Sequence, residues 1–429
     1  MNSKNESQPA NAVKLLKEEI IKNIDNAGKL ELLYRENKTS FKRAFNHVYT
    51  ELEENTTIRI WKERLNYEQE DIYFGTNKEW VFVILAVFIA GLIAKIPDMA
   101  SIDQEFFYSR NLSFIVFPVL TVYFAWRQKI SDLKLLLVSL IYLISALYIN
   151  FLPNQLKSDT LILACMHLPV FLWSVAGFIY VGNKNNNYRR RIDFLRYNGD
   201  LAVMMAILII SGVILTMITF GLFELIDVKI ESFFKQYVAI WGSAAIPIVA
   251  TYLIQSNPQL VNKISPVIAR LFMPVVLITL IVYLIAVIIS GKDPYNNRDF
   301  LIIFNVMLIG VMAIILFSVA ETFNKVQSKL RVSLLFALSL VAIIINGIAL
   351  SAILFRITEW GISPNRLAVL GSNILMLTNL LIVTYKLYIT LRDTNESDSV
   401  EKSIASFIPF YIVWTVLVTF IFPVLFGFK

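Results

Sequence analysis

Long apolar runs limit what this chain can fold into more than any other feature. Segments rich in Leu, Ile, Val and Phe, with few or no charges, recur along the sequence. Each has the roughly 17–25 residues that a helix needs to cross a bilayer. Hydrophobic residues make up 57% of the 429 positions and charged residues only 17%, whereas soluble domains carry more charge. The sequence therefore predicts an all-α, polytopic transmembrane helical bundle.

We predict about eleven spans, at residues 80–97, 110–126, 135–152, 160–181, 200–226, 236–254, 266–290, 299–321, 332–355, 365–390 and 404–427. The sixth and seventh contain Pro247 and Pro274, where a helix could break and line a site. A simple kink explains each proline equally well.

Eleven crossings place three loops rich in Lys and Arg on one side of the membrane, at 127–134, 182–199 and 322–331. The positive-inside rule makes that side cytoplasmic. We therefore expect a cytoplasmic N-terminus and an external C-terminus. Loop 391–403 fits this orientation poorly, because its acidic residues outnumber its basic ones.

Residues 1–79 are hydrophilic and hold thirteen Lys and Arg against fourteen Asp and Glu. The net charge of +7 therefore belongs to the membrane part. We interpret this excess of basic residues as the signal that orients the helices in the bilayer, and not as a nucleic-acid-binding surface. Apolar residues at helical spacing, such as Phe41 and Phe45, predict short amphipathic helices. We expect a small N-terminal cytoplasmic helical head at 1–79 and a transmembrane helical domain at 80–429. The head is either a docking module for a protein partner or a cap on the cytoplasmic loops.

Familiar catalytic and metal-binding motifs do not occur. The sequence has no phosphate-cradling G-x-x-x-x-G-K-[ST], no G-x-G-x-x-G after a strand and no H-E-x-x-H. Two histidines and one cysteine cannot build a histidine-rich metal site or an intrachain disulfide. The centres of the spans hold no Asp or Glu, the usual carriers of coupled transport. We assign no catalytic residue, metal or cofactor.

Two other polar features have alternative readings. His167 lies deep in a span, where it either contacts a ligand or stabilises the turn distorted by Pro169. Asp98, Asp103 and Glu105 gather in the first outer loop. These carboxylates could serve a lipid-linked transferase, although a solvated loop is the ordinary explanation.

Two outer loops share a pattern of arginine and asparagine. In GKDPYNNRDFLIIFN (291–305), Arg298 precedes Asn305 by seven residues, and in RITEWGISPNRLAVLGSN (356–373), Arg366 precedes Asn373 by seven. Seven residues make about two helical turns, so each arginine lies on one face with a deeper asparagine. Both helices enter from the outer side, which predicts two parallel helices with an arginine above a buried asparagine.

This arrangement favours an anionic ligand, because a helix start exposes unpaired N–H groups and arginine adds a donor fork. The predicted ligand-binding residues are Arg298, Asn305, Arg366, Asn373, Trp360, Glu359, Tyr295 and His167. In the alternative, the arginines and aromatic residues only anchor the helices at the membrane surface. Arg356 and Glu359 could also pair with each other, three residues apart.

Four segments, HLPVFLW (167–173), RRRIDFLRYNGD (189–200), DPYNNRDFLIIFN (293–305) and RITEWGISPNRLAVLGSNIL (356–375), carry a resemblance. With them the chain resembles a bacterial family of multi-pass membrane proteins catalogued as domain of unknown function 4153. The resemblance implies a location in the bacterial inner membrane. It implies no established activity and no catalytic residues.

Three functions remain open from the sequence. The preferred one is a permease-like or receptor-like protein that handles a small anionic or amphiphilic ligand from the outer face. The second is a membrane scaffold or signalling protein that acts through its head, and the third is the lipid-linked transferase. Membrane lipids are expected partners, nucleic acid is not, and the oligomeric state does not follow from the sequence.

Overall fold

The computed structural model describes residues 16–36, 41, 44–45, 48–49, 55–67, 77–154, 158–182, 187–224, 229–257, 273–282, 284–285, 289, 295, 298–322, 329–392 and 397–428. Every regular element within these ranges is a helix. The chain divides into two compact units, residues 1–73 and 74–429.

The first unit contains helices α2 (Ala27–Glu36) and α4 (Thr56–Tyr67). Its centre is aromatic. Phe41 and Phe45, which helical spacing places on one face, are both fully buried, and the Phe41 ring centroid lies 5.2 Å from that of Trp61. The unit thus has an apolar core of its own.

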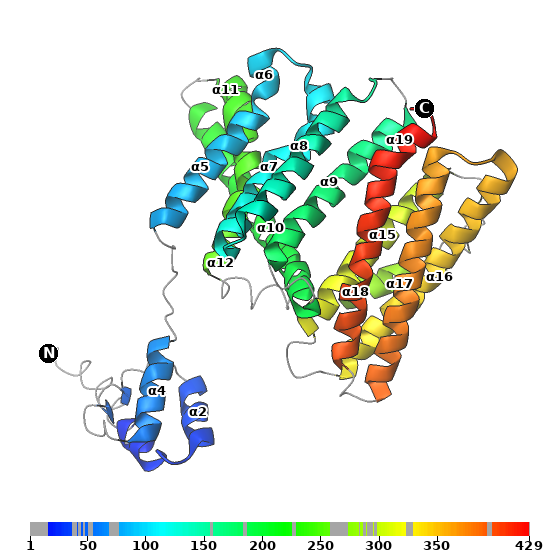
Figure 1. Ribbon diagram of the computed structural model, residues 1–429. Helices are drawn as coiled ribbons and strands as arrows, with labels where there is room; N and C mark the ends of the chain where they lie inside the picture. The colour runs from blue at the N-terminus through cyan, green and yellow to red at the C-terminus, as the bar shows by residue number, and fades with distance from the viewer. Residues whose placement is uncertain are drawn as a thin grey trace. The chain divides into compact units, whose positions relative to one another are not determined.

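The second unit is built from long helices that run up and down the bundle (Figure 1). Their bounds are α5 (Asn77–Ala94), α6 (Ile96–Ala100), α7 (Gln104–Gln128), α8 (Asp132–Phe151), α9 (Asp159–Val181), α10 (Tyr188–Glu224), α11 (Glu231–Phe233), the π-helix η1 (Phe234–Ala239), α12 (Ile240–Ser256), α15 (Arg298–Thr322), α16 (Lys329–Trp360), α17 (Pro364–Arg392), α18 (Ser397–Val416), the π-helix η3 (Leu417–Ile421) and α19 (Phe422–Leu425).

Seven described segments are long and apolar enough to cross a membrane. They are Asp132–Phe151, Asp159–Val181, Tyr188–Phe220, Glu231–Ser256, Lys329–Trp360, Pro364–Arg392 and Ser399–Leu425. Helices α5, α7 and α15 overlap three further predicted spans. The seventh predicted span is helical over Met273–Val282, and its flanks lie largely outside the described residues. The count of eleven therefore stays a prediction.

In the sixth predicted span, the structure excludes one of the two explanations offered for Pro247, a broken helix. Helix α12 continues through Pro247 without a break, and the Thr251 hydroxyl donates to the Pro247 carbonyl at 2.7 Å. The irregular backbone lies earlier, in the π-helical turns of η1. A membrane helix tolerates an internal proline when neighbouring groups satisfy the freed backbone.

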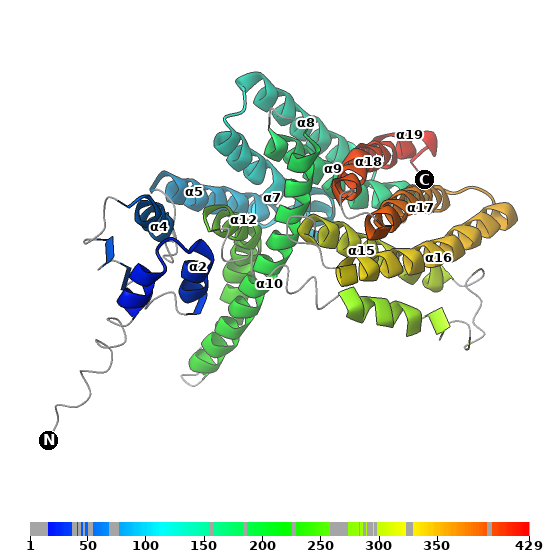
Figure 2. The same cartoon turned by 90° about the horizontal axis from the view of Figure 1, so that it is seen from below.

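Two apolar cores hold the second unit together, and α10 joins them. One core is formed by α5, α7, α8, α9, α12 and the first turns of α10, and includes Phe194. The other is formed mainly by α15, α16, α17 and α18, and includes Ile192 of the same helix. Figure 2 shows α10 crossing between the two groups of helices. Because α10 is common to both cores, the two groups form one packed unit.

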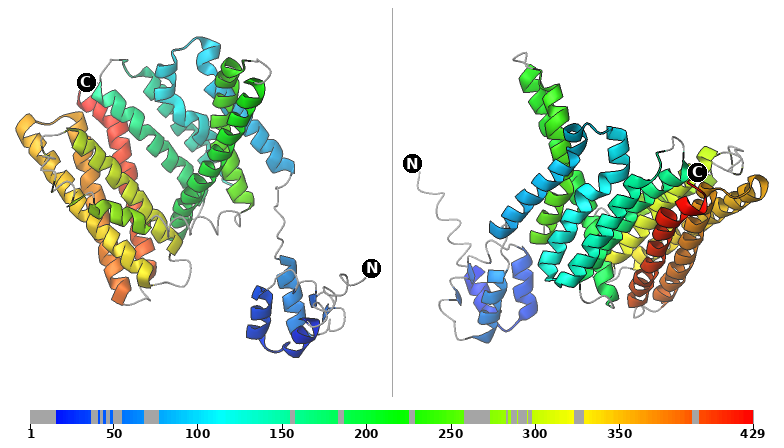
Figure 3. Two further views of the ribbon diagram at one scale, coloured as in Figure 1. Left: turned by 180° about the vertical axis from the view of Figure 1, so that it is seen from behind. Right: turned by 45° about the horizontal axis from the view of Figure 1, so that its top comes forward.

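Helix ends gather at two opposite ends of this unit (Figures 1 and 3). What we call the first end holds residues 95–103, the α16–α17 turn at 361–363, and residues 426–428. The second end holds residues 129–131, the start of α10, the start of α16 and the end of α17.

Candidate functional site

Helices α15 and α17 bring together two asparagines from separate parts of the sequence. The Asn373 Nδ2 donates a 2.8 Å hydrogen bond to Oδ1 of Asn305 and another, of 3.0 Å, to the carbonyl of Val369. Asn305 donates from its own Nδ2 to the carbonyl of Leu301 at 2.7 Å. Each asparagine lies less than three turns from the first residue of its helix, which gives the pair a similar depth.

Two further asparagines lie deeper in the bundle, with Asn379 six residues, or about 9 Å, beyond Asn373 along α17. Asn346 is fourteen residues before the end of α16 and Asn379 is fifteen after the start of α17, so antiparallel packing gives them the same depth. Asn346 and Asn373 are 0% exposed and Asn379 is 1% exposed. We call Asn305, Asn346, Asn373 and Asn379 the asparagine cluster.

The asparagine cluster contains amide atoms with no hydrogen-bond partner. Neither Oδ1 nor Nδ2 of Asn346 has one, and Oδ1 of both Asn373 and Asn379 also lacks one. The Nδ2 of Asn379 is used, because it donates to the Tyr411 hydroxyl at 3.0 Å. An unpaired buried amide costs about 1–3 kcal/mol, and native proteins usually satisfy such groups with water or a ligand. The cluster is therefore a place where water or a polar ligand would be stabilised.

Aromatic and basic side chains surround the α16–α17 turn at the first end. The guanidinium of Arg366 lies 5.7 Å from the centroid of the Trp360 ring, and that of Arg356 lies 4.8 Å from it. Phe355 packs edge-on against Trp360, with 6.3 Å between ring centroids, and Tyr295 packs edge-on against Phe355 at 5.8 Å. All five side chains are thus linked in one group, in which Trp360 contacts Arg356, Phe355 and Arg366.

Arg366 also closes the end of α16. Its Nη1 donates to the carbonyls of Trp360 and Gly361, each at 2.7 Å. Gly361 has a φ of 76°, a conformation that glycine adopts without steric cost after a helix. The last carbonyls of a helix lack partners within it, so Arg366 satisfies two acceptors there. One nitrogen of the predicted donor fork is therefore committed to the protein backbone.

The remaining predicted residues lie apart from one another. Arg298 opens α15, but its side chain lies outside the described part of the chain. Glu359 is exposed near the end of α16. His167 lies on α9, and its Nδ1 is 2.9 Å from the carbonyl of Leu163 in the same helix. That carbonyl is not the one at Cys165 that Pro169 leaves without its helical donor, so both interpretations of His167 stay predictions.

Two of the three carboxylates of the first outer loop, Asp98 and Asp103, have structural partners, and Glu105 is exposed. Asp98 pairs with Lys95 at 2.5 Å and accepts from Gln104 at 2.9 Å. The hydrogen bond from the Lys95 ammonium, with a second from Gln104, holds the pKa of Asp98 below its ordinary value. Asp103 caps α7 by accepting from the Phe106 amide at 2.7 Å. Within the described ranges, no group of three or more His, Cys, Asp or Glu could hold a metal ion.

Asn346, Asn379 and Tyr411 were not selected from the sequence. Each is a single polar residue within a long apolar run, as in VAIIINGIAL (341–350), and composition alone does not distinguish a buried position from one facing lipid. One feature of the sequence could have linked two of them. Asn346 and Asn379 lie at nearly equal distances from the α16–α17 turn, so antiparallel packing of the two helices places them at a similar depth.

Comparison with known proteins gives no name to this site. No family model matches the chain, no curated protein sequence is similar to it, and no solved structure is similar to it. The resemblance to domain of unknown function 4153 therefore stays a prediction.

Proposed function

We propose that this chain is a permease-like or receptor-like membrane protein that takes a small solute from the outer face into the asparagine cluster. The observation that carries the proposal is the Asn346 amide, which is fully buried near the middle of a 32-residue helix with neither polar atom paired. Binding sites in membrane transporters commonly lie near the bilayer midplane. A ligand that both donates and accepts hydrogen bonds would satisfy this amide.

The donors and acceptors indicate the class of ligand. Arg366 supplies positive charge next to the start of α17, where the helix dipole also favours an anion. Deeper in the bundle, the unpaired oxygens of Asn346, Asn373 and Asn379 need hydrogen-bond donors. Arg366 lies thirteen residues, or about 20 Å, before Asn379 along α17, so a small solute would meet the two in succession. We therefore expect a solute whose anionic group is attracted at the Arg366 end and whose hydroxyl, amine or amide then donates to the deeper amides.

The proposed route requires the first end to face outward. Basic residues concentrate at the second end, and include Arg127, Lys129, Arg189, Arg190, Arg191, Lys329, Arg331 and Arg392. A cytoplasmic second end satisfies the positive-inside rule. It also agrees with the proposed eleven spans, a cytoplasmic N-terminus and a bacterial inner-membrane location.

Ligand-induced stabilisation tests the proposal with purified full-length protein. The probes are lactate, glycerate, serine and glycerol phosphate, chosen because each joins an anionic group to a donor, with acetate and glycerol as controls that have only one of the two. We expect at least one probe to raise the melting temperature, because binding to the native state stabilises it. The Asn346→Leu variant should lose this response, and the Arg298→Ala plus Arg366→Ala double variant should weaken it.

Asn150→Leu is a matched control, since Asn150 exchanges hydrogen bonds with Asn111 elsewhere in the bundle at 2.8 and 2.9 Å. It should change the starting stability and retain the response to the probe. If every probe shifts the Asn346→Leu variant as much as the unmodified protein, the solute does not bind at the asparagine cluster.

The separate core of the first unit favours a second candidate function, an interaction through the N-terminal head. Phe41, Phe45 and Trp61 form that core without residues of the second unit. Deleting residues 1–79 distinguishes the two functions, because a permease should keep its response to the solute while a scaffold should lose its partner.

A further inference from the structure

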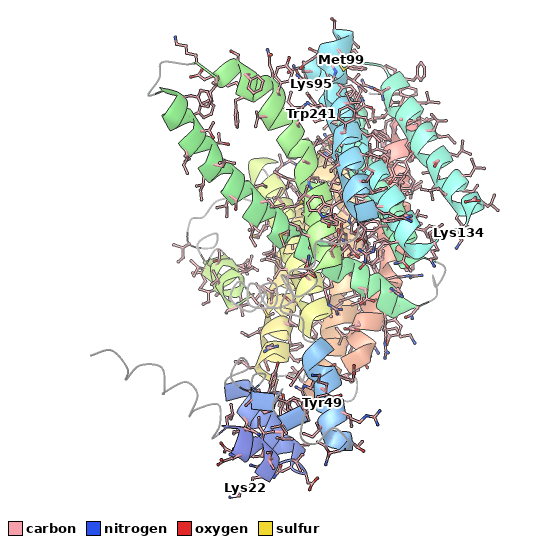
Figure 4. All side chains as sticks on the ribbon, turned by 90° about the vertical axis from the view of Figure 1, so that its left-hand side faces the viewer. Lys22, Tyr49, Lys95, Met99, Lys134 and Trp241 are labelled. Atoms are coloured by element: carbon pink, nitrogen blue, oxygen red, sulfur yellow. The ribbon has the colours of Figure 1, made fainter. Side chains whose placement is uncertain are left out.

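A groove of about 660 Å³ opens at the first end of the membrane unit. It is lined by Leu92, Lys95, Asp98, Met99, Tyr237, Val238 and Trp241. Figure 4 shows Lys95, Met99 and Trp241 near one another where α5 and α6 face the η1–α12 segment. None of these elements carries the asparagine cluster, so the groove is a separate feature.

The polar part of the groove carries one charge of each sign. Lys95 Nζ lies 2.5 Å from Asp98 Oδ2 and 4.7 Å from the centroid of the Tyr237 ring. The lysine side chain is only 11% exposed and the aspartate 32%. Gln104 holds the other carboxylate oxygen of Asp98 at 2.9 Å. The pair is electroneutral overall, and both charges are held in place by neighbours.

The apolar part of the groove has Trp241 as its floor. The Trp241 ring packs on Phe88, with 5.6 Å between ring centroids. It also covers Gly91 so closely that a Cβ added there would lie 2.3 Å from Cε3 of the ring. Met99 and Leu92 border the groove and are 73% and 38% exposed. An amphiphile could therefore place an apolar chain against Trp241 while its polar end meets Lys95 and Asp98.

The position of the groove along the helices corresponds to a membrane interface. Lys95 directly follows the last residue of α5, an apolar helix, and the polar loop of residues 101–103 follows α6. Tyr237 and Val238 come from η1, a stretch of π-helix. Such π-helical turns are rare and often occur at functional sites. Aromatic and lysine side chains at this level are typical of the boundary between head groups and acyl chains.

From these contacts we propose that the groove binds one zwitterionic phospholipid, specifically through a phosphate and an amine. The phosphate lies against the Lys95 ammonium, the amine lies against the Asp98 carboxylate, and the start of one acyl chain lies on Trp241. A net-anionic lipid fits less well, because Asp98 faces the same space and has no cation to offset it once Lys95 turns to the phosphate. The groove volume suits a head group with its adjoining glycerol region rather than a whole lipid.

Photolabelling in proteoliposomes tests this proposal with the full chain. The probe is a phosphatidylethanolamine with a diazirine near the start of one acyl chain, and mass spectrometry locates the labelled residues. We expect labelling at Met99, Val238 or Trp241. Unlabelled phosphatidylethanolamine should compete for it, and phosphatidylglycerol should compete poorly.

Lys95→Met and Asp98→Asn should each lower the labelling about tenfold, the effect of one lost charge-assisted hydrogen bond. Matched controls are Lys235→Met and Glu231→Gln, exposed residues of the neighbouring η1 and α11 that do not line the groove. Both should label like the unmodified protein. Gly91→Ala should displace the Trp241 ring and so reduce labelling, which tests the apolar part of the groove.

Two results would overturn the proposal. Equal labelling in the unmodified protein and in all three groove variants would mean contact with bulk lipid only. Equal competition by phosphatidylglycerol would mean that the groove recognises the phosphate alone. Melting temperatures of the variants, measured in the same lipid, show whether each has folded.

Discussion

Asn305 and Asn373, 68 positions apart in the sequence, share a hydrogen bond of 2.8 Å between α15 and α17. This contact ties the two helices that enter the bundle from its first end. It also leaves the Asn373 Oδ1 without a partner. One polar pair therefore both joins the helices and leaves a hydrogen-bond acceptor open to a ligand.

The first prediction concerns the strength of this pair. A double-mutant cycle with Asn305→Leu and Asn373→Leu should give a coupling energy of about 0.5–2 kcal/mol, the range for hydrogen bonds between membrane helices. The measurement is equilibrium unfolding in mixed micelles. A cycle between Asn305→Leu and the distant Asn150→Leu should give no coupling, and a null result for the first cycle would mean that the bond does not hold the helices together.

Asn346→Leu should stabilise the ligand-free protein, by about 1–3 kcal/mol. The substitution removes a buried amide with two unpaired atoms and replaces it by an apolar side chain of similar volume. The same change at Asn150, whose amide is paired with Asn111, should destabilise instead. Loss of stability in Asn346→Leu would contradict the argument, because it would mean that the amide is already satisfied.

Gly91→Ala should cost about 1–3 kcal/mol of unfolding free energy, because the added Cβ would overlap the Trp241 ring and force it to move. Gly242→Ala is its matched control. Gly242 is the residue after Trp241, and an added Cβ there would meet nothing within 4 Å. Since alanine favours a helix by up to about 1 kcal/mol over glycine, the control should be neutral or stabilising in the same unfolding measurement.

The ion pair between Lys95 and Asp98 predicts a dependence of stability on pH. The pKa of Asp98 is lowered in the folded protein, so its contribution is present above the unfolded pKa of about 3.9. It is lost as the pH falls from there through the folded pKa. The difference in melting temperature between the unmodified protein and Asp98→Asn should therefore be full at pH 7 and shrink below about pH 3.9. Glu231→Gln, whose carboxylate is outside the groove, should show no comparable loss.

Arg110→Met should destabilise the membrane unit by about 2 kcal/mol, because charged hydrogen bonds to buried acceptors are strong. Arg110 is 3% exposed and donates from Nη1 to the carbonyls of Ile149 and Leu152, the latter at 3.1 Å. Arg110 thus satisfies carbonyl groups at the C-terminal end of α8, where the negative end of the helix dipole also favours a cation. Arg127→Met, at a site 33% exposed, should cost less than about 1 kcal/mol. Equal losses in the two variants would contradict a special role for Arg110.

Much of the secondary structure could be predicted from the sequence, because it depends on local properties. Apolar runs such as the one through α9 must form helices in a membrane, where each backbone group needs a partner within the chain. The start of α17 at Pro364 is likewise a local property, because Ser363 accepts from the Arg366 amide at 3.3 Å and proline suits the first position of a helix. For Pro247 the sequence left a kink and a break as equal alternatives, because a proline alone does not distinguish them, and the structure shows a continuous helix.

The functional candidates depended more on packing. Seven-residue spacing singled out Asn305 and Asn373, yet Asn346 and Asn379 look like isolated polar residues until α16 folds back on α17. Arg110 lay at the edge of a predicted span, and no neighbouring residue in the sequence indicates that its side chain binds the carbonyls at the end of α8. The groove could not be foreseen at all, because Lys95 and Trp241 come from helices separated by more than a hundred residues.

That this is a helical membrane protein follows from local sequence, because the length and apolarity of each segment decide whether it can lie in lipid. Which polar side chains meet, and which remain unpaired, becomes known when the helices are packed. Hydrophobicity acts on each segment separately, whereas hydrogen bonds and grooves depend on the register and direction of neighbouring helices.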